Sequence, residues 1–125
     1  MAKRPASPPG LSHLRVTIAG DFYLGPGRAD LMELIAETGS ITAAGKRMGM
    51  SYKRAWSLVQ ALNDGFGAPL VTASRGGAGQ GGAVLTAAGQ AVLAHYRHMQ
   101  EATRTAIAGD LAALTAMLPD MAGKK

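Results

Sequence analysis

The feature that most constrains this chain is the stretch from Gly39 to Asn63, GSITAAGKRMGMSYKRAWSLVQALN, which holds two short helical patterns joined by a tight turn at Met48–Met50. Gly45 lies inside the first pattern, where a residue without a side chain allows two helices to approach closely, at a cost of about 1 kcal/mol relative to alanine. Gly49 suits the left-handed backbone conformation that ends a helix. This arrangement predicts a helix-turn-helix that reads DNA.

The second helical pattern has one apolar side and one polar side. Ser51 is expected to cap it, and four apolar residues at i, i+3, i+4 and i+7 form its buried side: Ala55, Leu58, Val59 and Leu62. The opposite side of the helix carries three polar residues, Lys53, Ser57 and Gln60. The flanks between the two sides carry Tyr52, Arg54 and Trp56. A helix anchored on one side, with donors near its N-terminal end on the other, is suited to entering the major groove.

The sequence leaves the roles of these side chains open. Lys53 and Arg54 either read guanine edges or hold phosphates. Trp56 borders both sides, so it is either a core tryptophan or a DNA contact, and the Tyr52 hydroxyl faces either a phosphate or water. The preceding helix contributes Ser40 and Thr42, either of which can cap it, to the predicted DNA contacts.

Two short apolar runs, Leu70–Ser74 and Ala83–Leu85, bracket the glycine-rich segment RGGAGQGG. They predict a β-hairpin, or wing, with Arg75 and Gln80 as DNA contacts along the phosphate backbone. A nucleotide-binding loop is a weak alternative because no GK[ST] follows the glycines. A merely flexible loop is the other alternative.

The regions on either side of this core have simpler patterns. Alternation from Arg15 to Ala19 predicts a strand, Asp21–Gly27 (DFYLGPG) reads as a turn-rich connection, and Arg28–Thr38 predicts a helix. A last helical pattern opens near Thr86 and runs to about Leu118, before Pro119. Gly109 is expected to bend or divide it.

That last helix is too long to bury its whole apolar stripe against so small a domain, so it predicts a homodimer. The residues expected at the interface are apolar or aromatic: Leu31, Leu34, Leu93, Tyr96, Ile107, Leu111 and Leu114. His95 and His98 are spaced for a shared metal ion but lack a third ligand, so no metal site is expected.

Charge supports a polyanionic partner. The chain carries a formal net charge of +5, and Thr38–Gly82 holds five basic residues against a single acidic one. A solvated basic face is the alternative reading of the charge alone. The sequence contains no cysteine. It also contains no run of about 18 apolar residues that could span a membrane, so we expect a cytoplasmic protein.

The expected fold is mainly α, a winged helix-turn-helix with a two-stranded β wing and a long C-terminal dimerisation helix. Its parts are a flexible leader over residues 1–14, the DNA-binding domain over 15–85, the long helix over 86–118 and a flexible tail over 119–125. The acidic residues and histidines are scattered, so we expect no catalytic residues, no enzyme activity and no cofactor. No small-molecule effector site is evident.

Much of the chain resembles the N-terminal DNA-binding domain of the ModE molybdate-responsive regulators. The segments that carry the resemblance are the run from GPGRADLMELIAETGSITAA to SYKRAWSLVQALN, then PLV, the glycine-rich tip and LTAAGQAVLAHY. That domain resembles the LysR winged helix more distantly. The resemblance covers about residues 16–99. It implies a dimer that binds palindromic double-stranded operators through the recognition helix and wing, with dimer contacts from the first and last helices.

Two departures from the ModE pattern limit what the resemblance implies. Gly45 stands where the family commonly has alanine, and both residues are small. The family continues into a molybdate-binding module that has no counterpart in this sequence, so molybdate is not carried over as a ligand. The leading hypothesis is a sequence-specific regulator of molybdenum-related genes. The alternative is an adaptor that pairs with another regulator through its last helix.

Overall fold

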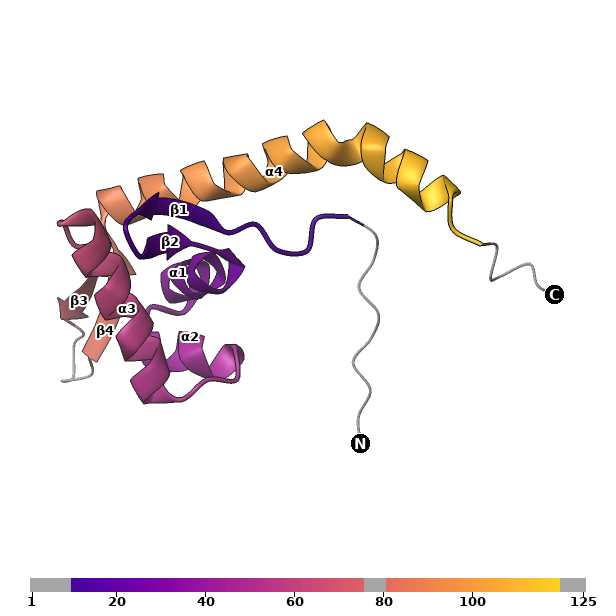
Figure 1. The fold of residues 1–125 in the computed structure, drawn as a ribbon. Helices are drawn as coiled ribbons and strands as arrows, with labels where there is room; N and C mark the ends of the chain where they lie inside the picture. Colours follow the sequence, from indigo (N-terminus) through magenta and orange to yellow (C-terminus); the bar gives the residue numbers. More distant parts are fainter. Residues whose placement is uncertain (1–9, 76–80, 120–125) are drawn as a thin grey trace.

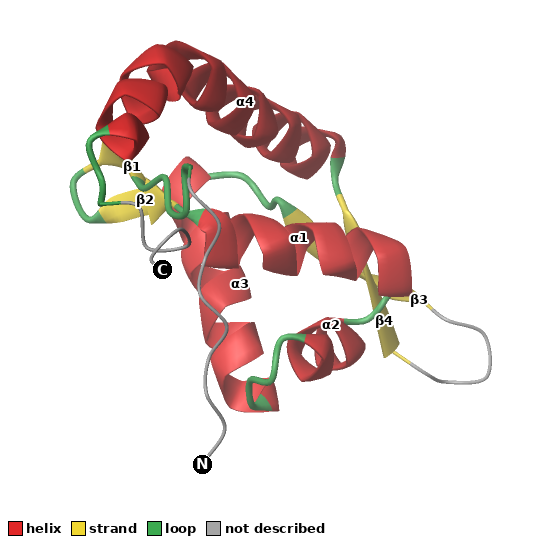
Figure 2. Cartoon of the chain, turned by 90° about the vertical axis from the view of Figure 1, so that its right-hand side faces the viewer, coloured by secondary structure: helices red, strands yellow, loops and turns green. Residues whose placement is uncertain are grey.

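The computed structural model describes residues 10–75 and 81–119 as a mainly helical fold with two small antiparallel hairpins (Figure 1, Figure 2). Its elements, in chain order, are β1 (Val16–Ala19), β2 (Phe22–Leu24), α1 (Pro26–Thr38), α2 (Ile41–Arg47), α3 (Tyr52–Phe66), β3 (Val71–Arg75), β4 (Gly81–Leu85) and α4 (Ala87–Ala116). The predicted winged helix-turn-helix with a long last helix is confirmed. Most of the predicted leader and tail, residues 1–9 and 120–125, lies outside the described residues.

Hydroxyl side chains cap three of the four helices. Ser40 Oγ accepts from the Ala43 amide at 3.0 Å, Ser51 Oγ from the Arg54 amide at 3.1 Å, and Thr86 Oγ1 from the Gly89 amide at 3.0 Å. Each bond satisfies an amide that has no partner within its own helix. Of the two candidates for the start of α2, Ser40 is therefore the cap.

The first hairpin is partly a departure from the sequence-based expectation. Phe22–Leu24 was expected in a turn-rich connection but forms strand β2, which pairs antiparallel with β1. A run of three residues is too short to show strand periodicity, and its pairing depends on tertiary contacts. Phe22 stacks edge-to-face on Phe66 of α3, with ring centroids 4.8 Å apart, and Leu24 is buried.

The core lies where α1 meets α2, α3, the second hairpin and the start of α4. Its largest fully buried side chains come from α1, α3, α4 and the loop before β3: Tyr96, Leu31, Met32, Ile35, Leu62, Leu70 and Val59. Burying one such side chain contributes roughly 1.5–3 kcal/mol. The core therefore joins the helix-turn-helix, the wing and the base of α4 in one unit.

The long helix α4 is continuous for 30 residues, about 45 Å. Its first half packs on the core, and its second half extends past the other helices, with a change of direction toward its C-terminal end (Figure 1). Gly109 does not divide the helix. Residues 10–14 form no helix or strand, and the Leu14 carbonyl accepts a hydrogen bond of 2.6 Å from the Tyr96 hydroxyl.

Candidate nucleic-acid interface

Helix α3 is anchored on one side and exposed on the other. Ala55, Val59 and Leu62 are buried, with Leu58 partly buried beside them. Lys53, Ser57 and Gln60 are exposed on the opposite side, as predicted from the helical spacing. The side of α3 that faces solvent thus carries cationic and hydrogen-bonding groups.

Two aromatic residues extend this polar face. Tyr52 is 57% exposed and Trp56 is 36% exposed, with their rings edge-to-face at a centroid distance of 6.2 Å. Trp56 is therefore not a core tryptophan. Partly exposed rings one turn apart on α3 are available for apolar contact with a ligand.

The turn between α2 and α3 depends on two glycines. A Cβ added at Gly45 would lie 2.9 Å from the Ala55 Cβ, so a side chain here would push the two helices apart. Gly49 has φ of +72°, in the left-handed region, and the Met50 amide donates back to the Gly45 carbonyl at 2.9 Å. These two positions set the angle at which α3 is presented.

The predicted hydroxyl contacts divide into two kinds. Ser40 and Ser51 use their oxygens as caps, which leaves each hydroxyl hydrogen free to donate to an acceptor outside the protein. Thr42 is exposed on the first turn of α2. A shallow hollow is lined by Ser40, Thr42, Tyr52, Trp56 and Ala83, so α2, α3 and the base of the wing meet around it.

The wing is held at a defined position beside this hollow. Val71–Arg75 pairs with Gly81–Leu85 in antiparallel register, and the Ala83 amide donates to the Gly39 carbonyl at 2.9 Å. The side-chain amide of Asn63 on α3 holds the backbone at the start of β3 through three hydrogen bonds. Its Oδ1 accepts from the Leu70 and Val71 amides, and its Nδ2 donates to the Val71 carbonyl. Arg75 ends β3, whereas the predicted contact Gln80 lies outside the described residues.

Two basic residues outside the predicted DNA-binding motifs, Arg15 and Arg28, lie close to α3. The guanidinium carbons of Arg15 and Arg28 lie 3.7 Å and 4.1 Å from the Tyr23 ring centroid, and both arginines line a small cavity with Arg54. Cation–π contacts hold each guanidinium in place. Tyr23 of β2 thus holds Arg15, which precedes β1, and Arg28 of α1 near Arg54 of α3, which no short-range pattern in the sequence indicates.

The residues predicted for a dimer interface fall into three groups. Leu31 and Tyr96 are 0% and 1% exposed, so they are core residues of one chain, and their assignment to an interface was wrong. Leu34 and Leu93 are partly buried against the same core. Ile107, Leu111 and Leu114 lie on the projecting half of α4, where Leu114 is 62% exposed, and their role stays a prediction.

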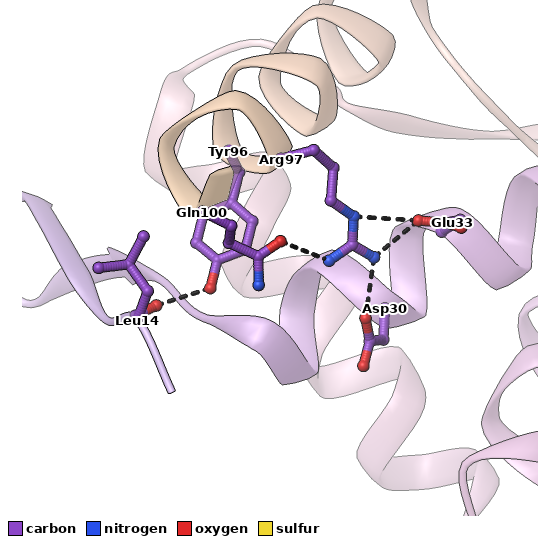
Figure 3. Close-up of polar contacts among 6 residues, drawn as sticks. All are labelled: Leu14, Asp30, Glu33, Tyr96, Arg97 and Gln100. Atoms are coloured by element: carbon purple, nitrogen blue, oxygen red, sulfur yellow. Dashed lines mark hydrogen bonds and ion pairs between the residues drawn. The ribbon is translucent and has the colours of Figure 1, made fainter. Parts of the chain in front are cut away.

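A polar cluster between α1 and α4 was not predicted from the sequence (Figure 3). Arg97 of α4 donates to Asp30 and Glu33 of α1 and to Gln100 on its own helix. Burial lowers the pKa of Arg97, but its bonds to the two carboxylates outweigh burial and leave that pKa raised. Arg97 is 64 positions from Glu33 and 67 from Asp30 along the chain, so only the fold brings it to these carboxylates.

His95 and His98 are both exposed, and residues 10–75 and 81–119 contain no group of three or more His, Asp or Glu side chains placed to hold a metal ion. Within the same residues, no helix combines the length and apolarity that crossing a membrane requires.

Comparisons with known proteins agree on one kind of domain. The family described as "Bacterial regulatory helix-turn-helix protein, lysR family" matches residues 29–90. Among solved structures, the CbnR chain of the CbnR DBD–DNA complex is 30% identical to this chain, with a TM-score of 0.52, and the match covers 72% of this chain and 95% of that one. CbnR is described as a LysR family transcriptional regulator.

Two curated relatives each match more than half of this chain. The molybdenum-pterin-binding protein MopB of Rhodobacter capsulatus is 51% identical over 58% of this chain and 27% of its own length. The DNA-binding transcriptional dual regulator ModE of Escherichia coli is 37% identical over 66% of this chain and 32% of its own length. The chain thus spans about a third or less of these two relatives.

Proposed function

Because this chain belongs to the LysR family of bacterial regulatory helix-turn-helix proteins, we propose that it acts as a homodimer on palindromic double-stranded operators. The observation that carries the proposal is α3, which is anchored by Ala55, Val59 and Leu62 and presents Lys53 and Gln60 outward. We place this protein in the cytoplasm, where such operators lie.

In this proposal each contact type has a separate task. The N-terminal half of α3, from Ser51 to Gln60, enters the major groove, where Lys53 and Arg54 meet base edges or phosphates. The hydroxyls of Ser40 and Thr42 donate to the phosphate backbone, and the wing from Arg75 to Gly82 follows that backbone. Two recognition helices related by a two-fold axis then lie about 34 Å apart, one turn of DNA.

The names of the relatives suggest which genes are regulated. MopB is described as molybdenum-pterin-binding and ModE as a DNA-binding regulator, and the segments they share with this chain include α3. We therefore propose operators of molybdenum-related genes as targets. The proposal includes no molybdate site in these 125 residues and no small-molecule effector.

A mobility-shift assay on DNA fragments selected from a genomic pool tests the proposal. Wild-type protein should select a palindrome and lose affinity steeply with salt, because phosphate contacts release counterions. Lys53→Ala and Arg54→Ala should each weaken binding by about tenfold, taking roughly 1–3 kcal/mol for a base contact. Arg104→Ala, which removes a cation from α4 instead, is the matched control and should bind normally.

Two results would count against the proposal. Binding without preference for any palindrome would make the protein a non-specific DNA binder. A protein that is monomeric alone and dimerises only with a second, different chain would support an adaptor instead, which sedimentation of the purified chain decides. Both α3 variants must also melt near the wild-type temperature. A large fall in melting temperature would mean that Lys53 or Arg54 stabilises the fold and that its loss weakens DNA binding indirectly.

A further inference from the structure

We propose that Arg97 is a positioning residue that fixes the direction in which α4 leaves the DNA-binding domain, and thereby the separation of the two recognition helices in the dimer. This inference depends on the proposed homodimer and concerns none of the groups that contact DNA. It rests on the contact between α1 and α4 shown in Figure 3.

The guanidinium of Arg97 uses all three of its nitrogens. Nη2 donates to Asp30 Oδ1 at 2.8 Å and to Glu33 Oε1 at 2.6 Å, Nε donates to Glu33 Oε1 at 3.1 Å, and Nη1 donates to Gln100 Oε1 at 3.0 Å. Asp30 and Glu33 are three residues apart on α1 and so lie on one side of that helix. A planar guanidinium held from both helices at once resists rotation of α4 about its contact with α1.

The exposure of these groups indicates a geometric role more than a stabilising one. The side chains of Arg97, Asp30 and Glu33 are 32%, 51% and 47% exposed, so solvent screens their attraction. The adjacent Tyr96 is almost fully buried and supplies the apolar anchor. The anchor holds α4 on the domain, and the Arg97 cluster restricts its angle.

The position of the cluster along α4 amplifies any change in angle. From Glu101 to the end at Ala116, α4 continues for about 24 Å and extends past the other helices (Figure 1). A tilt of about 10° at the cluster moves that end by about 4 Å, close to the rise of one base pair. If the dimer forms through this half of α4, the cluster fixes the half-site spacing to within about one base pair.

The absence of cysteine from the sequence makes a direct measurement possible. Asp64→Cys places one spin label at the exposed C-terminal end of α3, away from the proposed DNA contacts. Double electron–electron resonance on the full-chain homodimer then gives the distance distribution between the two α3 helices, without DNA. Wild type should give one narrow distribution, and Arg97→Gln should give one at least twice as wide.

Matched variants separate geometry from charge and from folding. Arg47→Gln removes an arginine of α2 whose ion pair is with Glu37 of α1 and does not involve α4, so the distribution should remain narrow. Arg97→Lys keeps the charge without the planar fork and should fall between the two. Glu33→Gln weakens the cluster from the α1 side and should also widen the distribution, which keeps the test valid if Arg97→Gln folds poorly.

Binding to selected palindromes adds a second readout that lost stability alone does not move. Inserting or deleting one base pair between half-sites should weaken wild-type binding at least tenfold and Arg97→Gln binding less than threefold, with equal affinity for a single half-site. A distribution that stays narrow in both Arg97→Gln and Glu33→Gln overturns this inference alone. A wild-type chain that gives no distance between copies and sediments as a monomer overturns the homodimer, and the inference with it.

Discussion

The two halves of α4 have different surroundings. In residues 87–100, Gly89 and Tyr96 are buried, and Val92, Leu93 and Met99 pack against the core. In residues 101–116, Leu114 is 62% exposed, and Ile107 and Leu111 line a groove shared with Leu11 of the N-terminal segment. One half is therefore a component of the domain, and the other carries apolar side chains that the fold of one chain leaves partly uncovered.

This difference bears on where the proposed homodimer forms. Helix α3 buries its apolar face within the chain and turns polar groups to solvent, which suits a charged ligand. The second half of α4 exposes apolar side chains beside a groove, which suits a protein surface. Variants that act on one half of α4 and leave the other intact test whether this division holds.

The largest effect is expected in the anchored half, from Gly89→Ala. A Cβ at this position would collide with the backbone carbonyl oxygen of Leu70, which cannot rotate away as a side chain would. We expect a loss of about 3 kcal/mol or more in the free energy of unfolding, measured by urea denaturation followed by circular dichroism. A urea midpoint equal to wild type would mean that α4 is not held against Leu70.

In the projecting half, Leu111→Ser should weaken dimerisation and leave the folded protomer intact. A two-fold interface contains the substitution twice, so losing burial of about 1.5 kcal/mol per copy lowers dimer affinity roughly 100-fold. Sedimentation equilibrium measures the affinity, with Ala113→Ser as the control for a polar change on the same half. An unaltered dimer would place the interface elsewhere.

A smaller effect is expected for Tyr96→Phe, which removes the hydrogen bond to the Leu14 carbonyl and should cost about 1 kcal/mol. Burial raises the pKa of Tyr96, and the nearby charge of Arg97 offsets this in part. Because the raised pKa favours the protonated native state, this contribution is complete below the unfolded tyrosine pKa of about 10 and is lost as pH rises through the folded value.

Urea midpoints at about pH 8 and about pH 11 measure this pH dependence. Wild type should lose more stability than Tyr96→Phe between these two values, because only wild type has the buried hydroxyl to ionise. Parallel losses in the two proteins would show that the Tyr96 hydroxyl is not the group responsible.

The smallest effect, and the opposite sign to Gly89→Ala, is expected for Gly109→Ala. Among the described residues, no atom beyond the adjacent turns of α4 lies within 4 Å of an added Cβ, and alanine favours the helix by up to about 1 kcal/mol over glycine. A modest rise in melting temperature, followed by circular dichroism at 222 nm, is the expected result. A fall would indicate that the bend in α4 depends on this glycine.

Much of the DNA-binding unit was predictable because its signals are local. Ser51 caps α3, Gly45 meets Ala55, and the faces of α3 follow from a period of 3.6 residues. The wing followed from two apolar runs around a glycine-rich tip. Strand β2 was missed because three residues carry too little pattern, and the exposure of Trp56 stayed open because it borders both faces of its helix.

By itself, the sequence determined which segments are helical, where α3 begins and which face of α3 is polar, since these depend on neighbours within about four residues. Only the tertiary structure decided that Leu31 and Tyr96 belong to the core, that Arg15 and Arg28 lie beside α3, and that Arg97 meets Asp30 and Glu33. The physical reason is that burial and ion pairing depend on which surfaces meet, and residues more than 60 positions apart meet only after the chain has folded.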